Sequence, residues 1–282
     1  CVGLDNKAFF FKFNLAIDKN TLFIADNFGT VLSYDLATKK IIWKNYLNTP
    51  FVSNLVFYKE AIFVTNANGK IYSFNSLNGK QNWSFEAGSE YSKSYKAFQI
   101  SINNDKVLFT NDAGIILCID LKTKSLLWNK VLVPSENFTG LNVIKFSNLV
   151  IEKNYVYVLS NFSNFVKFDI NNGNVVWSIM SNSVSRPLIS DNNIVFVDEN
   201  LSTVVMDKIS GKILFQKNLY LDFKIKLAKN KKVINSLLLI SDYFFILNYG
   251  LSSYKRFDPY KINAGAQLIL LLEICDDFFF ET

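Results

Sequence analysis

The sequence predicts an all-β fold, a β-propeller, because one strand-like segment recurs along the chain at the period of propeller blades. Apolar and polar residues alternate within this segment, as they do in a strand with two different faces. The aromatic residues that end its five copies lie 40, 45, 49 and 38 residues apart. Periods near 40 residues with four short strands per unit are typical of propeller blades.

The first copy of the segment runs from Gly29 to Trp43 and reads Gly-Thr-Val-Leu-Ser-Tyr-Asp-Leu-Ala-Thr-Lys-Lys-Ile-Ile-Trp. The copies align without a gap. Ser163 replaces the leading glycine in the fourth copy, and Phe215 replaces the tryptophan in the fifth. The shared positions are Gly29, Asp35 and Trp43; Gly69, Asn75, Gly79 and Trp83; Gly114, Asp120 and Trp128; Asp169, Gly173 and Trp177; and Asp207, Gly211 and Phe215.

Each copy predicts a strand, a tight turn and a second strand that carries the aromatic residue. Asp or Asn side chains at the turn can accept hydrogen bonds from nearby amides, and glycine tolerates positive φ. We therefore interpret Asp35, Asp120, Asp169 and Asp207 as turn caps rather than as a ring of binding carboxylates. Two further strand-like runs precede each copy, for example at 51–58 and 61–65, or at 98–103 and 106–110.

Counting strands predicts about six blades in a single domain of residues 1–282. The expected limits are 1–48, 49–90, 91–134, 135–182, 183–220 and 221–282. The last blade is degenerate, because residues 236–248 predict two strands and residues 268–282 fit no repeat. An incomplete ring would expose an apolar edge strand, which is an aggregation hazard.

The composition excludes several classes of site. The chain has no histidine, the commonest general base and metal ligand, and Cys1, Cys118 and Cys275 have no metal-type or pairing pattern. We therefore expect no metal site and no catalytic residues. The net charge of +6 comes from scattered lysines, so no nucleic-acid partner is expected. The densest cluster, at 224–232, is interpreted as a solvated connection, with an acidic partner or anionic lipid as the alternative.

The motif Asp-x-x-Thr/Asn-Gly/Lys-x-x-x-Trp, preceded by Gly-x-hydrophobic-hydrophobic-x-aromatic, resembles the tryptophan-docking motif of pyrroloquinoline-quinone (PQQ) propellers. The resemblance covers residues 15–260. It implies that each Trp packs between neighbouring blades against the turn of the adjacent repeat, and that a closed ring has seven or eight blades. Phe215 departs from the pattern, since a phenyl ring has no N–H to donate.

The resemblance leaves three functional hypotheses. Quinoprotein dehydrogenases of this fold use a quinone, Ca²⁺, a catalytic Asp and often adjacent cysteines, and no such set is recognisable here, so no cofactor is expected. The sequence is most similar in size class to the BamB family of periplasmic lipoproteins. That likeness implies a non-catalytic scaffold at the periplasmic face of the outer membrane, monomeric within a complex with a BamA-like barrel insertase. The alternative is a ligand-sensing propeller of a larger receptor or kinase.

The start of the sequence allows two interpretations. Cys1 could be the lipid-modified first residue of a mature lipoprotein, which would be the chain's link to a membrane. Alternatively, the sequence is a fragment. The apolar run at 8–11 follows Cys1 closely, whereas lipoproteins usually place a polar tether there, so the fragment interpretation is favoured.

Overall fold

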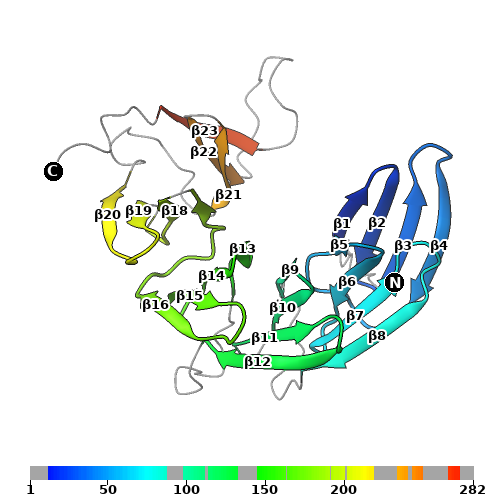
Figure 1. Ribbon diagram of the computed structural model, residues 1–282. Helices are drawn as coiled ribbons and strands as arrows, with labels where there is room; N and C mark the ends of the chain where they lie inside the picture. The colour runs from blue at the N-terminus through cyan, green and yellow to red at the C-terminus, as the bar shows by residue number, and fades with distance from the viewer. Residues whose placement is uncertain are drawn as a thin grey trace, which may run out of the picture. The chain divides into compact units, whose positions relative to one another are not determined.

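The computed structural model describes residues 12–87, 98–111, 114–132, 145–162, 164–190, 192–200 and 202–218, and the backbone of 234–240, 243–249 and 266–273. These residues form β-strands, turns and loops (Figure 1). The strands make five four-stranded sheets and one three-stranded sheet. The chain divides into two compact units, residues 1–145 and 146–282. Cys1, Cys275, Ser163 and the basic cluster at 224–232 lie outside the described residues.

The first unit contains three sheets. The first sheet consists of β1 (Phe13–Asp18), β2 (Thr21–Asp26), β3 (Thr30–Asp35) and β4 (Lys40–Tyr46). The second consists of β5 (Val56–Tyr58), β6 (Ala61–Thr65), β7 (Lys70–Asn75) and β8 (Gln81–Glu86). The third consists of β9 (Ile100–Asn103), β10 (Lys106–Thr110), β11 (Ile115–Asp120) and β12 (Ser125–Val131).

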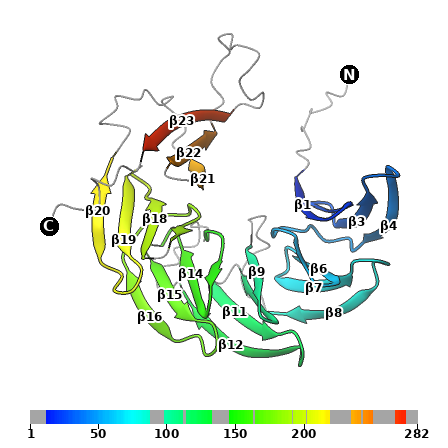
Figure 2. The ribbon, with the colours of Figure 1, turned by 45° about the horizontal axis from the view of Figure 1, so that its top comes forward.

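The second unit contains the other sheets, and the meander of the fifth sheet can be followed in Figure 2. The fourth sheet consists of β13 (Val150–Glu152), β14 (Tyr155–Leu159), β15 (Phe165–Asp169) and β16 (Val175–Ile179). The fifth consists of β17 (Leu188–Ile189), β18 (Asn193–Val197), β19 (Thr203–Asp207) and β20 (Ile213–Lys217). The three-stranded sheet consists of β21 (Ile234–Ile240), β22 (Tyr243–Tyr249) and β23 (Ala266–Glu273).

Every four-stranded sheet is a simple antiparallel meander, in which each strand pairs with the strand before and after it. This confirms the predicted all-β propeller architecture of four-stranded antiparallel blades. The predicted pair of strands at 236–248 corresponds to β21 and β22. A further strand, β23, comes from a stretch outside the repeat pattern and pairs with β22 along its length.

A β-bulge recurs in all five four-stranded sheets, between the last turn and the aromatic residue. In the first sheet, Ser33 pairs with Trp43 and Tyr34 pairs with Ile41, so Ile42 is the extra residue. The same shift occurs in the other four sheets. In an uninterrupted pairing, Trp43 would lie opposite Leu32 and point to the other face of the sheet. The bulge therefore decides which neighbouring sheet the aromatic residue can reach.

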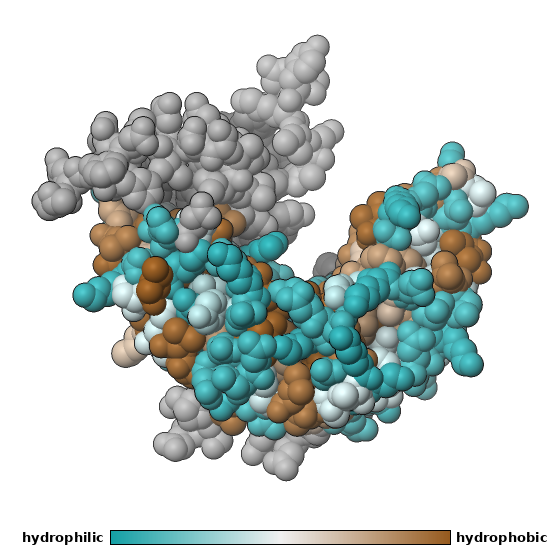
Figure 3. Space-filling model, viewed as in Figure 1, coloured by the Kyte–Doolittle hydropathy of each residue, from teal (hydrophilic) through white to brown (hydrophobic). Residues whose placement is uncertain are grey.

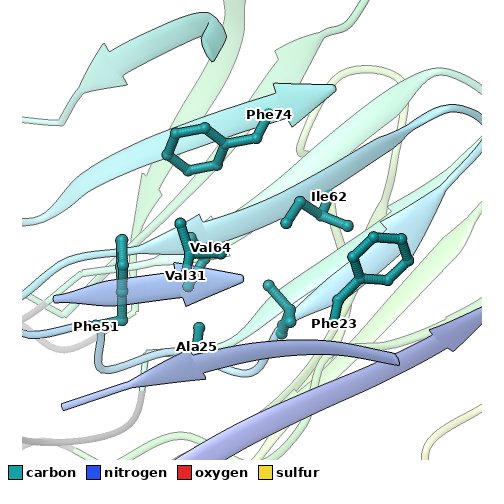
Figure 4. Close-up of a cluster of buried hydrophobic side chains, with 8 residues drawn as sticks. Phe23, Ala25, Val31, Phe51, Ile62, Val64 and Phe74 are labelled. Carbon is teal, nitrogen blue, oxygen red and sulfur yellow. The ribbon is translucent and has the colours of Figure 1, made fainter. Parts of the chain in front are cut away.

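The best-described core lies between the first and second sheets (Figure 4). Phe23, Ala25 and Val31 on the first sheet face Ile62 and Phe74 on the second, and each of these side chains is at most 2% exposed. Alternation places these residues on one face, since successive side chains of a strand point to opposite faces. Burial of these apolar side chains favours the packed state by about 1.5–3 kcal/mol for each large one.

Replacing Phe74 by alanine tests this core. We expect Phe74→Ala to lower the free energy of unfolding by about 3–5 kcal/mol, because a fully buried aromatic side chain leaves a cavity. Leu77→Ala is the control, since Leu77 is 73% exposed and its truncation should change stability by at most about 0.5 kcal/mol. Urea unfolding of both variants measures the difference. Equal effects would contradict the assigned core.

Candidate functional site

Trp43 on β4 lies on the hairpin turn of the second sheet. Its indole Nε1 donates a hydrogen bond to the Ser76 carbonyl oxygen at 2.8 Å. The ring covers Gly79, where an added Cβ would be 2.6 Å from the indole atoms Cδ2 and Cε3. Gly79 also has a φ of +73°, a conformation that L side chains rarely adopt. Only glycine satisfies both the backbone conformation and this close contact.

A second side chain of the same strand fixes the contact. The amide Nδ2 of Asn45 donates a hydrogen bond to the Gly79 carbonyl oxygen at 2.5 Å. Trp43 and Asn45 are two residues apart, so both point from the same face of β4 toward the next sheet. The turn is thus held by one apolar contact and two directed hydrogen bonds.

Trp177 makes the equivalent contact in the second unit. Its Nε1 donates to the Lys208 carbonyl oxygen at 3.2 Å. A Cβ added to Gly211 would be 3.0 Å from the indole, so this fit is less tight than at Gly79. The Trp177 ring also meets Phe165 edge-on, with ring centroids 5.2 Å apart.

The other three aromatic anchors occupy the same position of their strands. Trp83 on β8 has its ring centroid 6.0 Å from that of Phe63 and packs against the buried cluster that the second and third sheets share. Trp128 on β12 is 8% exposed and pairs with Cys118. Phe215 on β20 is half-buried and pairs with Val205 in the same register.

The Asp or Asn residue at the turn of each motif caps its own turn. Asp35 Oδ1 accepts hydrogen bonds from the amides of Ala37 and Thr38, both at 2.8 Å. Asn75, Asp120 and Asp207 cap their turns in a similar way. Amide donors stabilise the charged carboxylate. The hydrogen bond from the Thr38 amide lowers the pKa of Asp35, the one from the Thr123 amide lowers that of Asp120, and hydrogen bonds from Ser210 lower that of Asp207.

A second capped turn, which the sequence reasoning missed, joins the second and third strands of a sheet. Asp26 Oδ1 accepts from the amides of Phe28 and Thr30, and Asn66 Oδ1 accepts from Asn68 and Lys70. Asp198 caps the same turn of the fifth sheet. The signal was an Asp or Asn three residues before the leading position of four of the five motifs, the fourth motif having Ser160 there.

A buried lysine lies under the aromatic anchor of the fourth sheet, and sequence reasoning did not single it out. Lys167 is 6% exposed, and its Nζ donates to the Lys208 carbonyl oxygen at 3.0 Å, the acceptor that Trp177 also uses. The ammonium lies over the rings of Tyr155 and Tyr157, 4.4 and 5.5 Å from their centroids. The other sheets have Ser33, Ser73, Cys118 and Val205 at this register position.

Burial is the largest influence on Lys167 and lowers its pKa, and the neighbouring Lys208 acts in the same direction. The Lys208 ammonium is itself paired with Glu152 at 3.0 Å and donates to the Ser190 carbonyl oxygen at 2.7 Å. Two lysines therefore link the fourth sheet to the hairpin of the fifth. This polar link adds to the aromatic contact of Trp177.

The second and third sheets are linked by polar contacts as well. Asn54 donates from Nδ2 to the Ile100 carbonyl oxygen at 2.9 Å and accepts from the Ile100 amide at 2.7 Å, so its side chain pairs like a short strand. Asp105 accepts from Lys59 and from the Tyr58 hydroxyl. The hydrogen bond from Lys59 lowers the pKa of Asp105.

Within the described ranges, no three His, Cys, Asp or Glu side chains converge as a metal site would require. Burial raises the pKa of the Cys118 thiol to about 12, which suits a packed apolar side chain. Among the same residues, no helix is long and apolar enough to span a bilayer.

Comparison with known proteins shows which family the chain matches. A family model described as outer membrane protein assembly factor BamB matches residues 11–217. Proteins with the same description are similar in Moranella endobia, at 18% identity over 68% of this chain and 50% of the relative, and in Nitrosomonas eutropha, at 23% over 61% and 42%. The chain thus spans about half the length of these curated relatives.

Solved structures share the fold. BamB from Moraxella catarrhalis has a TM-score of 0.63 at 13% identity, over 82% of this chain and 68% of that one. A europium-containing methanol dehydrogenase has a TM-score of 0.60 at 14% identity, over 72% and 50%. Because BamB and a methanol dehydrogenase are both similar at this level, these structures show the fold alone.

A double-mutant cycle tests the contact between Trp43 and Gly79. We expect Trp43→Ala to cost about 3 kcal/mol, because a half-buried aromatic anchor is removed. Gly79→Ala should cost at least about 1–2 kcal/mol for the positive φ alone, and more because Cβ displaces the indole. Urea unfolding should show that the double variant loses at least about 1 kcal/mol less free energy of unfolding than the two single variants lose together. Additive losses would contradict the contact, and Tyr46→Ala, at 62% exposure, is the neutral aromatic control.

Acid titration tests the turn cap of Asp35. The pKa of Asp35 is lowered in the folded state. Its contribution to the free energy of unfolding is therefore complete above the unfolded-state pKa of about 3.9, and it is lost as the pH falls through the folded-state pKa. Urea denaturation at pH values between 5 and 2 should show that Asp35→Asn loses less stability on acidification than the unchanged protein, because asparagine keeps the hydrogen-bond acceptor but does not titrate. Asn75→Asp, at the equivalent turn, should increase the loss. Parallel curves for all three proteins would refute the assignment.

Proposed function

The chain belongs to the family of the outer membrane protein assembly factor BamB, and we propose that it is a non-catalytic scaffold in the assembly of outer-membrane β-barrel proteins. The observation that carries this proposal is the family match over residues 11–217, the stretch that contains all five aromatic motifs. We place it at the periplasmic face of the outer membrane, as a monomer bound to a BamA-like barrel insertase.

The physical character of the chain supports a scaffold. Aromatic anchors and capped turns fix neighbouring sheets, so the loops between strands are held by a rigid framework. Loops on such a framework can recognise peptides or strand edges without any catalytic group. The residues of the repeat motif hold the sheets and turns together, as the hydrogen bonds of Trp43, Asp35 and Trp177 illustrate. We also propose that residues 1–282 are one propeller domain, with the aromatic motif as its interblade contact.

Copurification tests the proposed function. The tagged chain, produced in cells with the barrel insertase of its own organism, should retain that insertase through washing and elution. A PQQ-type dehydrogenase of similar fold, tagged in the same way, is the control and should retain none. The chain should also show no dye reduction after addition of PQQ and Ca²⁺. Loss of the insertase during washing, or saturable quinone binding with dye reduction, would reject the proposal.

A further inference from the structure

The two residues before the aromatic anchor are exposed in every four-stranded sheet. They are Ile41 and Ile42, Gln81 and Asn82, Leu126 and Leu127, Val175 and Val176, and Ile213 and Leu214. The second sheet has a packed neighbour on either side within the first unit, and Gln81 and Asn82 are nevertheless exposed there. The pair therefore lies at the outer margin of a sheet, where a neighbouring sheet does not cover it.

Four of the five pairs are apolar although they are exposed. Leu126 and Leu127 on β12 are 38% and 42% exposed, and Ile213 and Leu214 on β20 are 49% and 59% exposed. In both of these sheets the preceding sheet of the same unit is packed in place. Figure 3 shows hydrophobic groups set among hydrophilic ones over the part of the surface where β12 runs in Figure 1. The packing of the sheets thus leaves these apolar side chains in contact with the surroundings.

Lysines lie beside the apolar pair of the third sheet, on the turn between β11 and β12. The side chain of Lys122 is 78% exposed, although its ammonium is 3.6 Å from Asp105. Lys124 is exposed and has no ion-pair partner among the described residues. The carboxylate of the turn, Asp120, accepts hydrogen bonds from backbone amides, and Asp105 is already bound by Lys59. Positive charge on this hairpin therefore remains for an external anion.

The other sheets separate the two features. The first and fifth sheets combine them, since Lys40 precedes Ile41 and Lys212 precedes Ile213. The fourth sheet has the apolar pair but only Asn and Gly in its turn, at 171–174. The chain therefore contains a matched pair of sites, one with lysines and one without.

A hairpin with exposed leucines and lysines suits a bilayer surface better than a protein surface. Interfaces between proteins are enriched in aromatic residues and arginine and depleted in lysine. The hairpin at 120–131 has three lysines and no arginine, and its one aromatic residue, Trp128, is only 8% exposed. Segments that lie on a membrane surface bury apolar side chains at the headgroup boundary and place lysines against anionic lipids.

We propose that the β11–β12 hairpin docks on an anionic phospholipid bilayer. Leu126 and Leu127 enter the headgroup boundary, and Lys122 and Lys124 lie against the lipid phosphates. Each lysine near an anionic surface strengthens binding about fivefold, and the apolar pair adds to this in proportion to the area it buries. The site rests on the geometry of the hairpin. The bilayer that it meets in the cell, the periplasmic leaflet of the outer membrane, rests on the proposed function.

Vesicle binding tests this surface. The probe is a vesicle of phosphatidylcholine with about 30% phosphatidylglycerol, and vesicles of phosphatidylcholine alone are the reference. Cosedimentation at about 0.05 M salt should show that the purified chain partitions at least about tenfold more strongly to the anionic vesicles. Raising the salt to about 0.5 M should remove most of this difference, because the lysine charges are then screened.

Variants locate the contact. Leu126→Gln combined with Leu127→Asn gives the third sheet the pair that the second sheet carries at the same position, so the fold accepts it. This variant should weaken binding to the anionic vesicles at least about fivefold. The matched control is Val175→Gln combined with Val176→Asn in the fourth sheet, which should change binding less than about twofold because no lysine lies in that turn.

Three results would overturn the inference. They are equal partitioning to the two kinds of vesicle, equal effects of the variants in the third and fourth sheets, and binding of polyglutamate in place of vesicles, which would assign the hairpin to an acidic protein. Copurification separates the two proposals. A chain that retains the insertase but does not bind anionic vesicles rejects the bilayer contact and leaves the scaffold function standing, and the reverse result does the opposite.

Discussion

An aromatic ring lying on the hairpin turn of the next sheet is the contact on which the described packing depends. At Trp43 the ring and Gly79 are so close that a single methyl group would collide with the indole. The indole N–H and the Asn45 amide then fix the orientation of the turn by hydrogen bonds. The contact therefore combines burial of an apolar ring with directed hydrogen bonds.

This contact has a local requirement, the bulge between the turn and the aromatic residue. The extra residue Ile42 brings Trp43 opposite Ser33 and so onto the face that meets the second sheet. Its equivalents recur in every four-stranded sheet. Without the bulge, strict alternation would pair Trp43 with Leu32 and turn the ring to the opposite face of the sheet. Variation is nevertheless tolerated at the position beneath the anchor, where Lys167 replaces a small side chain and adds a polar link to Lys208.

The functional proposals follow from different parts of the molecule. The aromatic and capping residues are used internally, so they explain rigidity and family membership rather than recognition. Recognition must involve groups that the packing leaves unsatisfied. The same fold also supports quinone-dependent dehydrogenases, which is why the solved structures alone do not decide the activity.

The sequence by itself determined the repeat, its turns and its strands, because these depend on interactions between residues close in the chain. Alternating side chains, glycines at positive φ and Asp35 at its turn are local features, and they predicted four-stranded antiparallel sheets correctly. Tertiary structure alone decided which side chains meet across sheets. The Asn54 pairing with Ile100 and the Lys167 contact with Lys208 join residues 46 and 41 positions apart, and no local pattern specifies them.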